Sequence, residues 1–290
     1  MSFLALLRYN EKNSKRGETE MLTDYHNHLE RGTLTLDYLR QFTDEAARKG
    51  IQHFGISEHA YHFYQTKNIL SNPWVEARRC YDMADYVRLF HEAWDAGIDV
   101  KMSIEMDYTP GKHEEMAAFI RSYEFDYVIG SIHWVDDFGI DLVEYRHEWE
   151  RRDLYDTYRK YFDQVVTLAE SNLFDIIGHL DLVKIFKYVP EDEEFLLEQY
   201  DRATTALANS KTCVEISTAG LRKPVGELYP DPRLLKMCYD KGIPIVLSSD
   251  AHVPEHVGAD FDKAVELARS IGYTELMTFS KGERKAVPLG

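Results

Sequence analysis

The segment Leu22–His28 (LTDYHNH) is the first stretch of the chain with the length and composition of a β-strand, and it ends on two histidines. Side chains of a strand alternate between its two faces, so His26 and His28 project to the same side and can share one metal ion. Further segments of strand length follow it: His53–Ser57, Val100–Glu105, Tyr127–His133, Phe174–His179, Cys213–Ser217 and Pro244–Ser248.

Stretches with helical periodicity separate these strands. They are Leu36–Lys49, Val75–Ala96, Trp149–Ser171, Glu193–Ala208 and Asp231–Lys241. This alternation is typical of βα units in a parallel sheet, and about seven repeats without a flexible linker predict one α/β barrel. An open doubly wound sheet is disfavoured, because neither GxGxxG nor GxxxxGK[ST] occurs in the chain. Residues 1–20 are polar and lack periodicity, so we expect them to lie outside a single domain formed by residues 21–290.

The charge and cysteine content exclude several classes of partner and site. Thirty-four Lys and Arg against 50 Asp and Glu give a net charge of −16, which repels nucleic-acid backbones and anionic lipids. No apolar run reaches the roughly 18–20 residues that span a bilayer. The three cysteines form no CxxC, so neither a disulfide framework nor a thiolate zinc site is predicted. We expect a cytoplasmic protein without nucleic-acid or membrane partners, and nothing in the sequence indicates its oligomeric state.

Metal-binding side chains gather at the carboxyl ends of the predicted strands, which form the catalytic face of an α/β barrel. Besides His26 and His28, they are His59, Glu105, His133, His179, Asp250 and His252. Asp250 and His252 repeat, after the last strand, the spacing of the first pair. Any one of these histidines could be an ordinary core or surface residue, but together they are too many for a single ion. We therefore predict two or three divalent metals, zinc, manganese or iron, with Glu105 able to bridge two of them.

Other polar and aromatic residues are interpreted as structural. The histidines without a partner at ligand spacing, which we expect to be solvated, are His62, His91, His113 and His147. His53 falls at the start of a strand, away from the catalytic face, and Cys213 is expected to be a buried strand residue. Aromatic side chains at 61–64 or at Trp134 could wall a pocket for an imidazole ring, but nothing in the sequence selects them.

Six short motifs carry a family resemblance. They are HNH at 26–28, SEH at 57–59, EMDY at 105–108, GSIH at 130–133, GHLD at 178–181 and SDAH at 249–252. In this order, over residues 22–280, they resemble the motifs of the polymerase-and-histidinol-phosphatase (PHP) family of metal-dependent phosphoesterases. EMDYTPG at 105–111, STAGLRKP at 217–224, ELYP at 227–230 and the PLG ending are similar to its monofunctional histidinol-phosphatase branch.

The resemblance implies a distorted (β/α)7 TIM-like barrel with a trinuclear metal centre. It implies three ligand sets: His26, His28, Glu105 and Asp250; Glu105, His133 and His179; and His59 and His252 with one further ligand. That further ligand is commonly a histidine several residues after HxH, but none occurs here before His53. Glu30 is the substitute that we expect, unless it is a solvated loop acid. A carboxylate there would shift metal preference from zinc towards manganese or iron.

The resemblance also implies an activity, the hydrolysis of a phosphomonoester by a hydroxide held between the metals. The branch implies L-histidinol phosphate as the substrate, in histidine biosynthesis. Glu105, Asp250 and His252 are the expected catalytic residues, together with Asp181, which would orient a ligand imidazole or protonate the leaving alkoxide.

Phosphate contacts are expected from basic side chains at the catalytic face. Arg222 follows the strand that ends at Ser217, and a guanidinium matches phosphate in bidentate fashion. Lys184 is a weaker candidate. Three alternatives stay open: a PHP phosphoesterase acting on phosphotyrosine or a nucleotide, a polymerase-linked nuclease, and a metal-binding barrel without catalysis.

Overall fold

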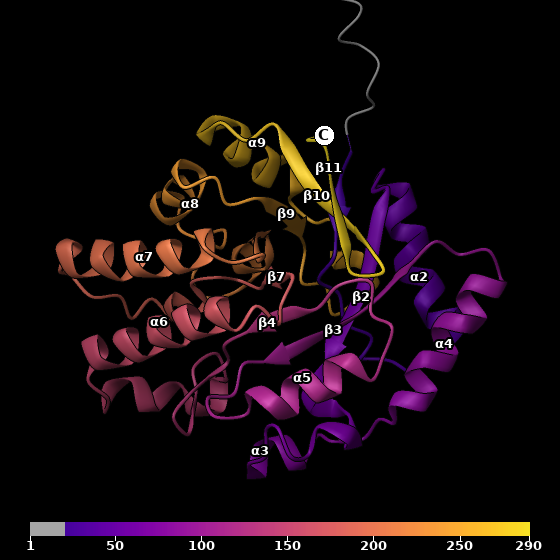
Figure 1. The fold of residues 1–290 in the computed structure, drawn as a ribbon, viewed down its shortest axis with the longest axis horizontal. Helices are drawn as coiled ribbons and strands as arrows, with labels where there is room; N and C mark the ends of the chain where they lie inside the picture. The colour runs from indigo at the N-terminus through magenta and orange to yellow at the C-terminus, as the bar shows by residue number, and fades with distance from the viewer. Residues whose placement is uncertain (1–20) are drawn as a thin grey trace, which may run out of the picture.

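Strands and helices alternate along the chain in a computed structural model, which describes residues 21–290 (Figure 1). The expected extension, residues 1–20, lies outside the described residues. The main sheet has seven parallel strands in the order β1-β2-β3-β4-β7-β8-β9. They are β1 (Thr23–Asp24), β2 (His53–His59), β3 (Lys101–Asp107), β4 (Ile129–Ser131), β7 (Ile176–Ile177), β8 (Cys213–Ser217) and β9 (Ile245–Ser248). The predicted single α/β domain is confirmed.

Side-chain and bridge contacts between the first and last strands bring the sheet close to a closed barrel. The hydroxyl of Thr23 in β1 accepts a hydrogen bond from Leu247 N at 2.9 Å and donates one to Leu247 O at 3.2 Å. Further along, Asn27 and Ala251 form a parallel bridge, in which His28 N donates to Ala251 O at 2.8 Å. This seam places the HNH segment of residues 26–28 beside residues 250–252.

Helices cover the outside of the barrel, as Figure 1 shows. They are α2 (Leu36–Arg48), α3 (Pro73–Glu76), α4 (Met83–Asp95), α5 (His113–Arg121), α6 (Leu154–Ser171), α7 (Glu193–Ala208), α8 (Pro232–Asp240) and α9 (Phe261–Ile271). Single turns of 3-10 helix occupy several loops: Ala60–His62, Tyr64–Thr66, Leu182–Lys184, Ala219–Arg222 and Pro254–His256, with a longer one at Val143–Glu150. Among residues 21–290, none of the helices combines the length and the apolar composition that crossing a bilayer requires.

The helix predicted over residues 75–96 is wrong, because this stretch forms two helices. Helix α4 begins only after Asp82, whose carboxylate caps it by accepting from Ala84 N at 2.8 Å. Between the helices, Cys80 N and Tyr81 N both donate to His62 O, at 2.8 and 2.9 Å. The chain is therefore not helical between α3 and α4, and its backbone N–H groups there form hydrogen bonds to the loop that follows β2. The helix predicted from 149 likewise begins later, at Leu154, after the Asp153 cap.

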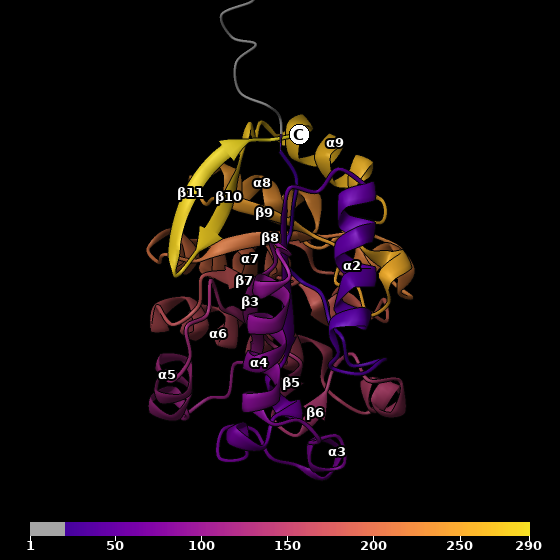
Figure 2. The same cartoon turned by 90° about the vertical axis from the view of Figure 1, so that its right-hand side faces the viewer.

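A C-terminal hairpin that the sequence pattern did not predict covers the amino ends of the barrel strands. Strands β10 (Glu275–Ser280) and β11 (Glu283–Pro288) pair antiparallel (Figure 2). The hairpin is tied to segments that precede barrel strands, since Lys281 N and Gly282 N both donate to Asp126, at 2.9 Å each. Its Phe279 packs into the barrel interior with a group of buried side chains: Tyr25, Tyr127, Ile129, Ile176, Cys213 and Val246. The expected burial of Cys213 is confirmed. Strands β5 (Trp134–Val135) and β6 (Phe138–Gly139) form a smaller hairpin after β4.

The seam between β1 and β9 generates a stability prediction. Thr23→Val keeps the shape of the buried side chain but leaves Leu247 N and O unpaired, so it should lower the free energy of unfolding by about 1–3 kcal/mol. The measurement is urea unfolding of the metal-free protein followed by circular dichroism. Thr23→Ser, which keeps the hydroxyl, is the control. Equal stability of Thr23→Val and wild type would show that the hydroxyl does not hold the seam.

Candidate metal centre

The predicted metal ligands converge at the carboxyl ends of the barrel strands. Each of them falls in at least one group whose nitrogen or carboxylate oxygen atoms all lie within 4.8 Å of one another. The groups are His26, His28 and Asp250; His26, Glu105 and His179; His59, Glu105 and His133; His28, His59 and His252; and Glu30, Glu58, His59 and His62. The barrel thus brings together side chains that are separated by up to 226 residues in the sequence (252 − 26).

The carboxylate of Glu105 lies at the centre of these groups and is only 1% exposed. Its Oε2 lies 3.2 Å from His26 Nε2 and 3.2 Å from His59 Nε2. Its Oε1 lies 3.2 Å from His179 Nε2 and 3.5 Å from His133 Nε2. Since the two oxygens face different imidazoles, Glu105 could contribute one oxygen to each of two metal ions.

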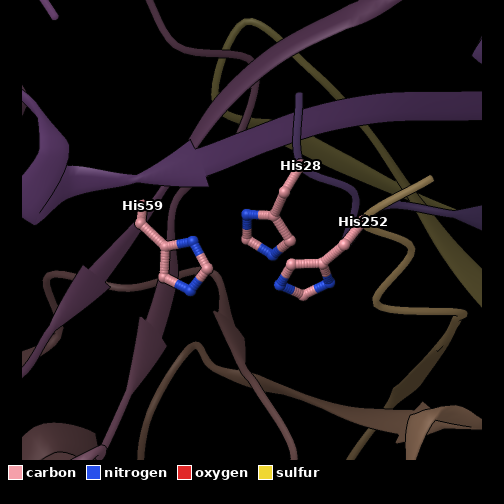
Figure 3. Close-up of side chains that lie close together, drawn as sticks. All are labelled: His28, His59 and His252. Atoms are coloured by element: carbon pink, nitrogen blue, oxygen red, sulfur yellow. The ribbon is translucent and has the colours of Figure 1, made fainter. Parts of the chain in front are cut away.

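Three imidazoles form a second part of the cluster. Figure 3 shows His28, His59 and His252 side by side, although they come from three separate segments of the chain. The rings of His28 and His59 are stacked with centroids 4.1 Å apart, and the centroids of His28 and His252 are 4.5 Å apart. His28 Nε2 also lies 3.4 Å from Asp250 Oδ1, so this part of the cluster joins the one around Glu105.

Glu30 is a member of the cluster, where a third metal was expected. Its Oε2 lies 3.3 Å from His59 Nδ1, and its Oε1 lies 3.4 Å from His252 Nε2. The alternative interpretation of Glu30 as a solvated loop acid is wrong, because the side chain faces these imidazoles.

The interpretation of His62 as a solvated imidazole is also wrong. His62 is 8% exposed, with Nε2 2.9 Å from Glu30 Oε2 and Nδ1 2.8 Å from Arg78 O. It was missed because the 3-10 turn Ala60–His62 that follows β2 sets residues 59 and 62 on one side, a spacing that strand periodicity does not indicate. The histidines expected to be solvated that are indeed exposed are His91, His113 and His147.

A further layer of buried carboxylates orients the imidazoles. His26 Nδ1 lies 2.7 Å from Glu215 Oε2, and His133 Nδ1 lies 2.9 Å from Asp107 Oδ1. His28 Nδ1 lies 3.6 Å from Glu58 Oε1. Each contact leaves the other ring nitrogen directed at the centre, an arrangement typical of metal-ligating histidines. The sequence offered one signal for Glu215, an acid in the middle of an otherwise apolar strand.

The buried carboxylates and imidazoles of the cluster shift one another's pKa values. Burial would lower the pKa of His26 and His59, but nearby carboxylates, Glu105 first among them, raise the pKa of both well above the usual value. Burial would raise the pKa of Glu105, but the imidazoles that face it hold that pKa well below the usual value. By contrast, burial and the neighbouring His28 lower the pKa of His252 to about 3. The imidazole of His252 is therefore neutral near pH 7, and this part of the cluster gains no positive charge from protonation of that ring.

The donor set fits divalent metal ions. His26 Nε2, His28 Nε2 and Glu105 Oε2 are buried and have no hydrogen-bond partner within residues 21–290. Buried polar atoms are rarely left unpaired, and here they point at common centres. Imidazole and carboxylate ligands together suit zinc, manganese and iron. These residues could therefore hold the two or three divalent ions that the sequence predicts.

The remaining predicted site residues lie in the loops after β7 and β8. Arg222 donates through Nη2 to Ser249 O, next to Asp250. Lys184 is 5% exposed and donates to Leu228 O at 3.1 Å, while its Nζ lies 3.0 Å from Asp181 Oδ2.

The catalytic role predicted for Asp181 stays a prediction. Its Oδ2 accepts from Asp231 N at 2.8 Å and pairs with Lys184, while its Oδ1 is buried without a hydrogen-bond partner in residues 21–290. Asp181 and Lys184 therefore fasten the segment at 227–231 to the loop after β7.

Comparison with known proteins agrees with this geometry. The PHP domain family matches residues 24–219. A protein of Deinococcus radiodurans named as a probable histidinol-phosphatase is 41% identical over 175 residues, which span 60% of this chain and 66% of that protein. A histidinol-phosphatase of Lactococcus lactis is 25% identical over 270 residues, 89% of this chain and 94% of that one.

Among solved structures, the histidinol phosphate phosphatase of Lactococcus lactis in complex with zinc, L-histidinol and phosphate shares the fold. The TM-score is 0.70 at 23% sequence identity, over 92% of this chain and 100% of that chain. A structure from Listeria monocytogenes, named as a putative histidinol phosphatase, gives a TM-score of 0.67 at 19% identity, over 83% and 99% of the two chains. The PHP match covers more than half of the sequence and includes most of the ligand cluster. The chain belongs to the PHP domain family.

Proposed function

We propose that the chain is a metal-dependent phosphomonoesterase that hydrolyses L-histidinol phosphate to L-histidinol and phosphate. The observation that carries the reaction class is the buried carboxylate of Glu105 among imidazoles from neighbouring strand ends, which fits a cluster of divalent ions. The substrate is supported by two relatives named as histidinol-phosphatases and one named as a probable histidinol-phosphatase. The biosynthetic role of such an enzyme makes the cytoplasm its expected location.

These overlapping groups could together hold three ions. His26, His28 and Asp250 would share a first ion with Glu105, and His133 and His179 would share a second with it. His59 and His252 would hold a third with Glu30, and His62 could complete it. When bound, such ions polarise phosphoryl oxygens and make water a nucleophile near neutral pH. Glu105, Asp250 and His252 are proposed to contribute to catalysis by holding the ions in place.

The residues around the cluster would position the phosphate. Arg222 donates through its guanidinium to Ser249 O, next to Asp250 in the loop after β9. A guanidinium in this position would attract a phosphate dianion to the metal cluster.

Lys184 stays a weaker candidate for a phosphate contact, because its ammonium is already paired with Asp181. We propose no nucleic-acid partner, and the acidic net charge supports this. All three cysteines, Cys80, Cys213 and Cys238, are free thiols, which agrees with a reducing compartment.

The first prediction concerns the substrate. Metal-loaded protein should hydrolyse L-histidinol phosphate with a kcat/KM at least about 100-fold above that for phosphotyrosine, a nucleoside monophosphate or p-nitrophenyl phosphate, a difference of about 2.7 kcal/mol in transition-state binding. Steady-state kinetics under identical conditions measure it. Comparable rates on all four would leave a phosphoesterase of other specificity. Absence of turnover with metals bound would favour a barrel that binds metals without catalysis.

The second prediction concerns Glu215. Because its carboxylate contacts His26 Nδ1 and accepts from His179 N at 3.1 Å, Glu215→Gln should weaken metal retention about 10–100-fold. Metal content after dialysis against graded chelator concentrations measures this. Glu193→Gln on the exposed face of α7 is the matched control and should behave as wild type. Unchanged retention in Glu215→Gln would remove Glu215 from the support of the centre.

The third prediction concerns Arg222. Arg222→Ala should raise KM about tenfold or more without loss of metal, since one hydrogen bond to a charged group contributes about 1.5–3 kcal/mol. Arg222→Lys should recover part of the loss, because it keeps the charge but not the planar fork. KM and metal content are measured on the same samples. A variant that loses metal instead would show that the bond to Ser249 O holds the metal loop and not the phosphate.

A further inference from the structure

The loop that carries Arg222 is closed at its base. Ser217, the last residue of β8, and Tyr229 form an antiparallel bridge, in which Ser217 N donates to Tyr229 O at 2.8 Å and Tyr229 N donates to Ser217 O at 3.0 Å. We call residues 218–228 the Arg222 loop. Arg222 lies on its outgoing arm, in a single 3-10 turn, and residues 226–228 form its returning arm.

The two arms of the Arg222 loop are packed directly against each other. Gly226 N on the returning arm donates to Gly220 O on the outgoing arm at 3.1 Å. A Cβ atom added to Gly220 would lie only 2.0 Å from Glu227 O, so the arms approach as closely as their backbones allow. A displacement of the returning arm would therefore move the turn that holds Arg222.

The loop after β7 holds the returning arm through a buried ion pair. Lys184, 5% exposed, donates from Nζ to Leu228 O at 3.1 Å and lies 3.5 Å from Glu227 Oε2. The carboxylate of Asp181, 1% exposed, lies with Oδ2 3.0 Å from that Nζ and accepts from Asp231 N at 2.8 Å. The pair thus binds the chain on both sides of the bridge that closes the Arg222 loop.

Burial distinguishes this pair from the ion pairs on the surface. Water screens an exposed pair, and such pairs contribute little to holding a segment in place. Asp181 and Lys184 are shielded from water, so each charge depends on the other and on the backbone groups at 228 and 231. The returning arm therefore has one preferred position, and so does the turn that holds Arg222.

The ion pair also connects the Arg222 loop to the metal centre. Leu182 N donates to His179 O at 2.8 Å, so the turn that carries Lys184 begins beside a predicted metal ligand. Arg222 is fastened from another side, since its Nη2 donates to Ser249 O in the loop after β9. Two separate loops thus fix the guanidinium relative to the metal ligands.

We propose that Lys184, held by Asp181, is a positioning residue that sets the place of Arg222 at the metal centre. It acts through the returning arm and does not touch the phosphate itself. The inference rests on the proposed function, in which Arg222 contacts the phosphate. A guanidinium that is displaced from its place binds phosphate less tightly, even where the metal centre is intact.

The test is a double-mutant cycle on metal-loaded protein, with inorganic phosphate as the ligand and isothermal titration calorimetry as the measurement. Lys184→Met removes the ammonium and keeps an unbranched side chain. It should weaken phosphate binding about three- to tenfold and raise KM for L-histidinol phosphate by a similar factor, with kcat changed less than about twofold and metal content unchanged. In Arg222→Ala protein the same substitution should add less than about twofold, because a residue that acts through Arg222 has no effect once the guanidinium is gone.

Two further variants control for folding and for charge. Lys184→Met leaves the carboxylate of Asp181 buried without its ammonium, so circular dichroism first checks that the variant folds. Asp181→Asn/Lys184→Met removes both charges but keeps an amide oxygen that can accept from Asp231 N, and it should lose phosphate binding to the same extent. Lys236→Met, which removes the exposed ion pair to Asp240 in α8, is the matched control and should bind phosphate as wild type does.

Other outcomes would overturn the inference in distinguishable ways. An equal loss of phosphate binding in the wild-type and Arg222→Ala backgrounds would mean that Lys184 acts on the phosphate independently of Arg222. Unchanged phosphate binding with a lower unfolding temperature would mean that the ion pair only stabilises the fold. Loss of metal would mean that it supports His179. If the coupling to Arg222 is found but wild type shows no preference for L-histidinol phosphate, the proposed substrate fails and the positioning role is supported.

Discussion

The buried negative charge of Glu105 is the constraint on which the rest of the structure depends. An isolated carboxylate at 1% exposure would lose several kcal/mol of hydration, and only nearby cations or hydrogen-bond donors can restore it. The barrel supplies them by ending its strands on imidazoles, so that His26, His59, His133 and His179 all meet the two oxygens of one side chain. Because these imidazoles come from four different strand ends, the strands must assemble into the barrel before the carboxylate is fully surrounded.

Folding and metal binding are coupled in this barrel. The imidazoles around Glu105 are held by a further layer of carboxylates, of which Glu215 bonds to both His26 and His179. Without bound cations, the buried carboxylates of this interior depend on protonated imidazoles for compensating charge. Metal ions would therefore stabilise the folded chain as well as serve the reaction, because binding to the folded state alone adds to its stability.

Much of this arrangement could be predicted from the sequence, because strand-end histidines appear as local motifs. The alternation of short apolar runs with amphipathic stretches was enough to predict the barrel and the side of it that carries the ligands. Contacts between distant residues could not be predicted in this way. Glu215 meets His26 across 189 residues, and nothing around it in the sequence names that partner.

Some local backbone conformations were also not predicted. His62 enters the site because a single 3-10 turn follows β2, and the segment from 77 to 82 leaves the helical path to bind His62 O. The hairpin of β10 and β11 was not predicted, because it is held by packing against the end of the assembled barrel. That packing does not appear in the local sequence pattern.

The seam between β1 and β9 has a consequence for how the protein reaches this state. Thr23 and Leu247 are 224 residues apart, so the first strand cannot find its partner until almost the whole barrel has been synthesised. Contacts between such distant residues slow folding, because the entropy of closing the loop must be lost before the contact is gained. During that interval β1 and β9 are open edges, and unpaired edges are where chains join one another by mistake. Synthesis of this protein would thus include a period of exposure to aggregation, which ends when Thr23 reaches Leu247.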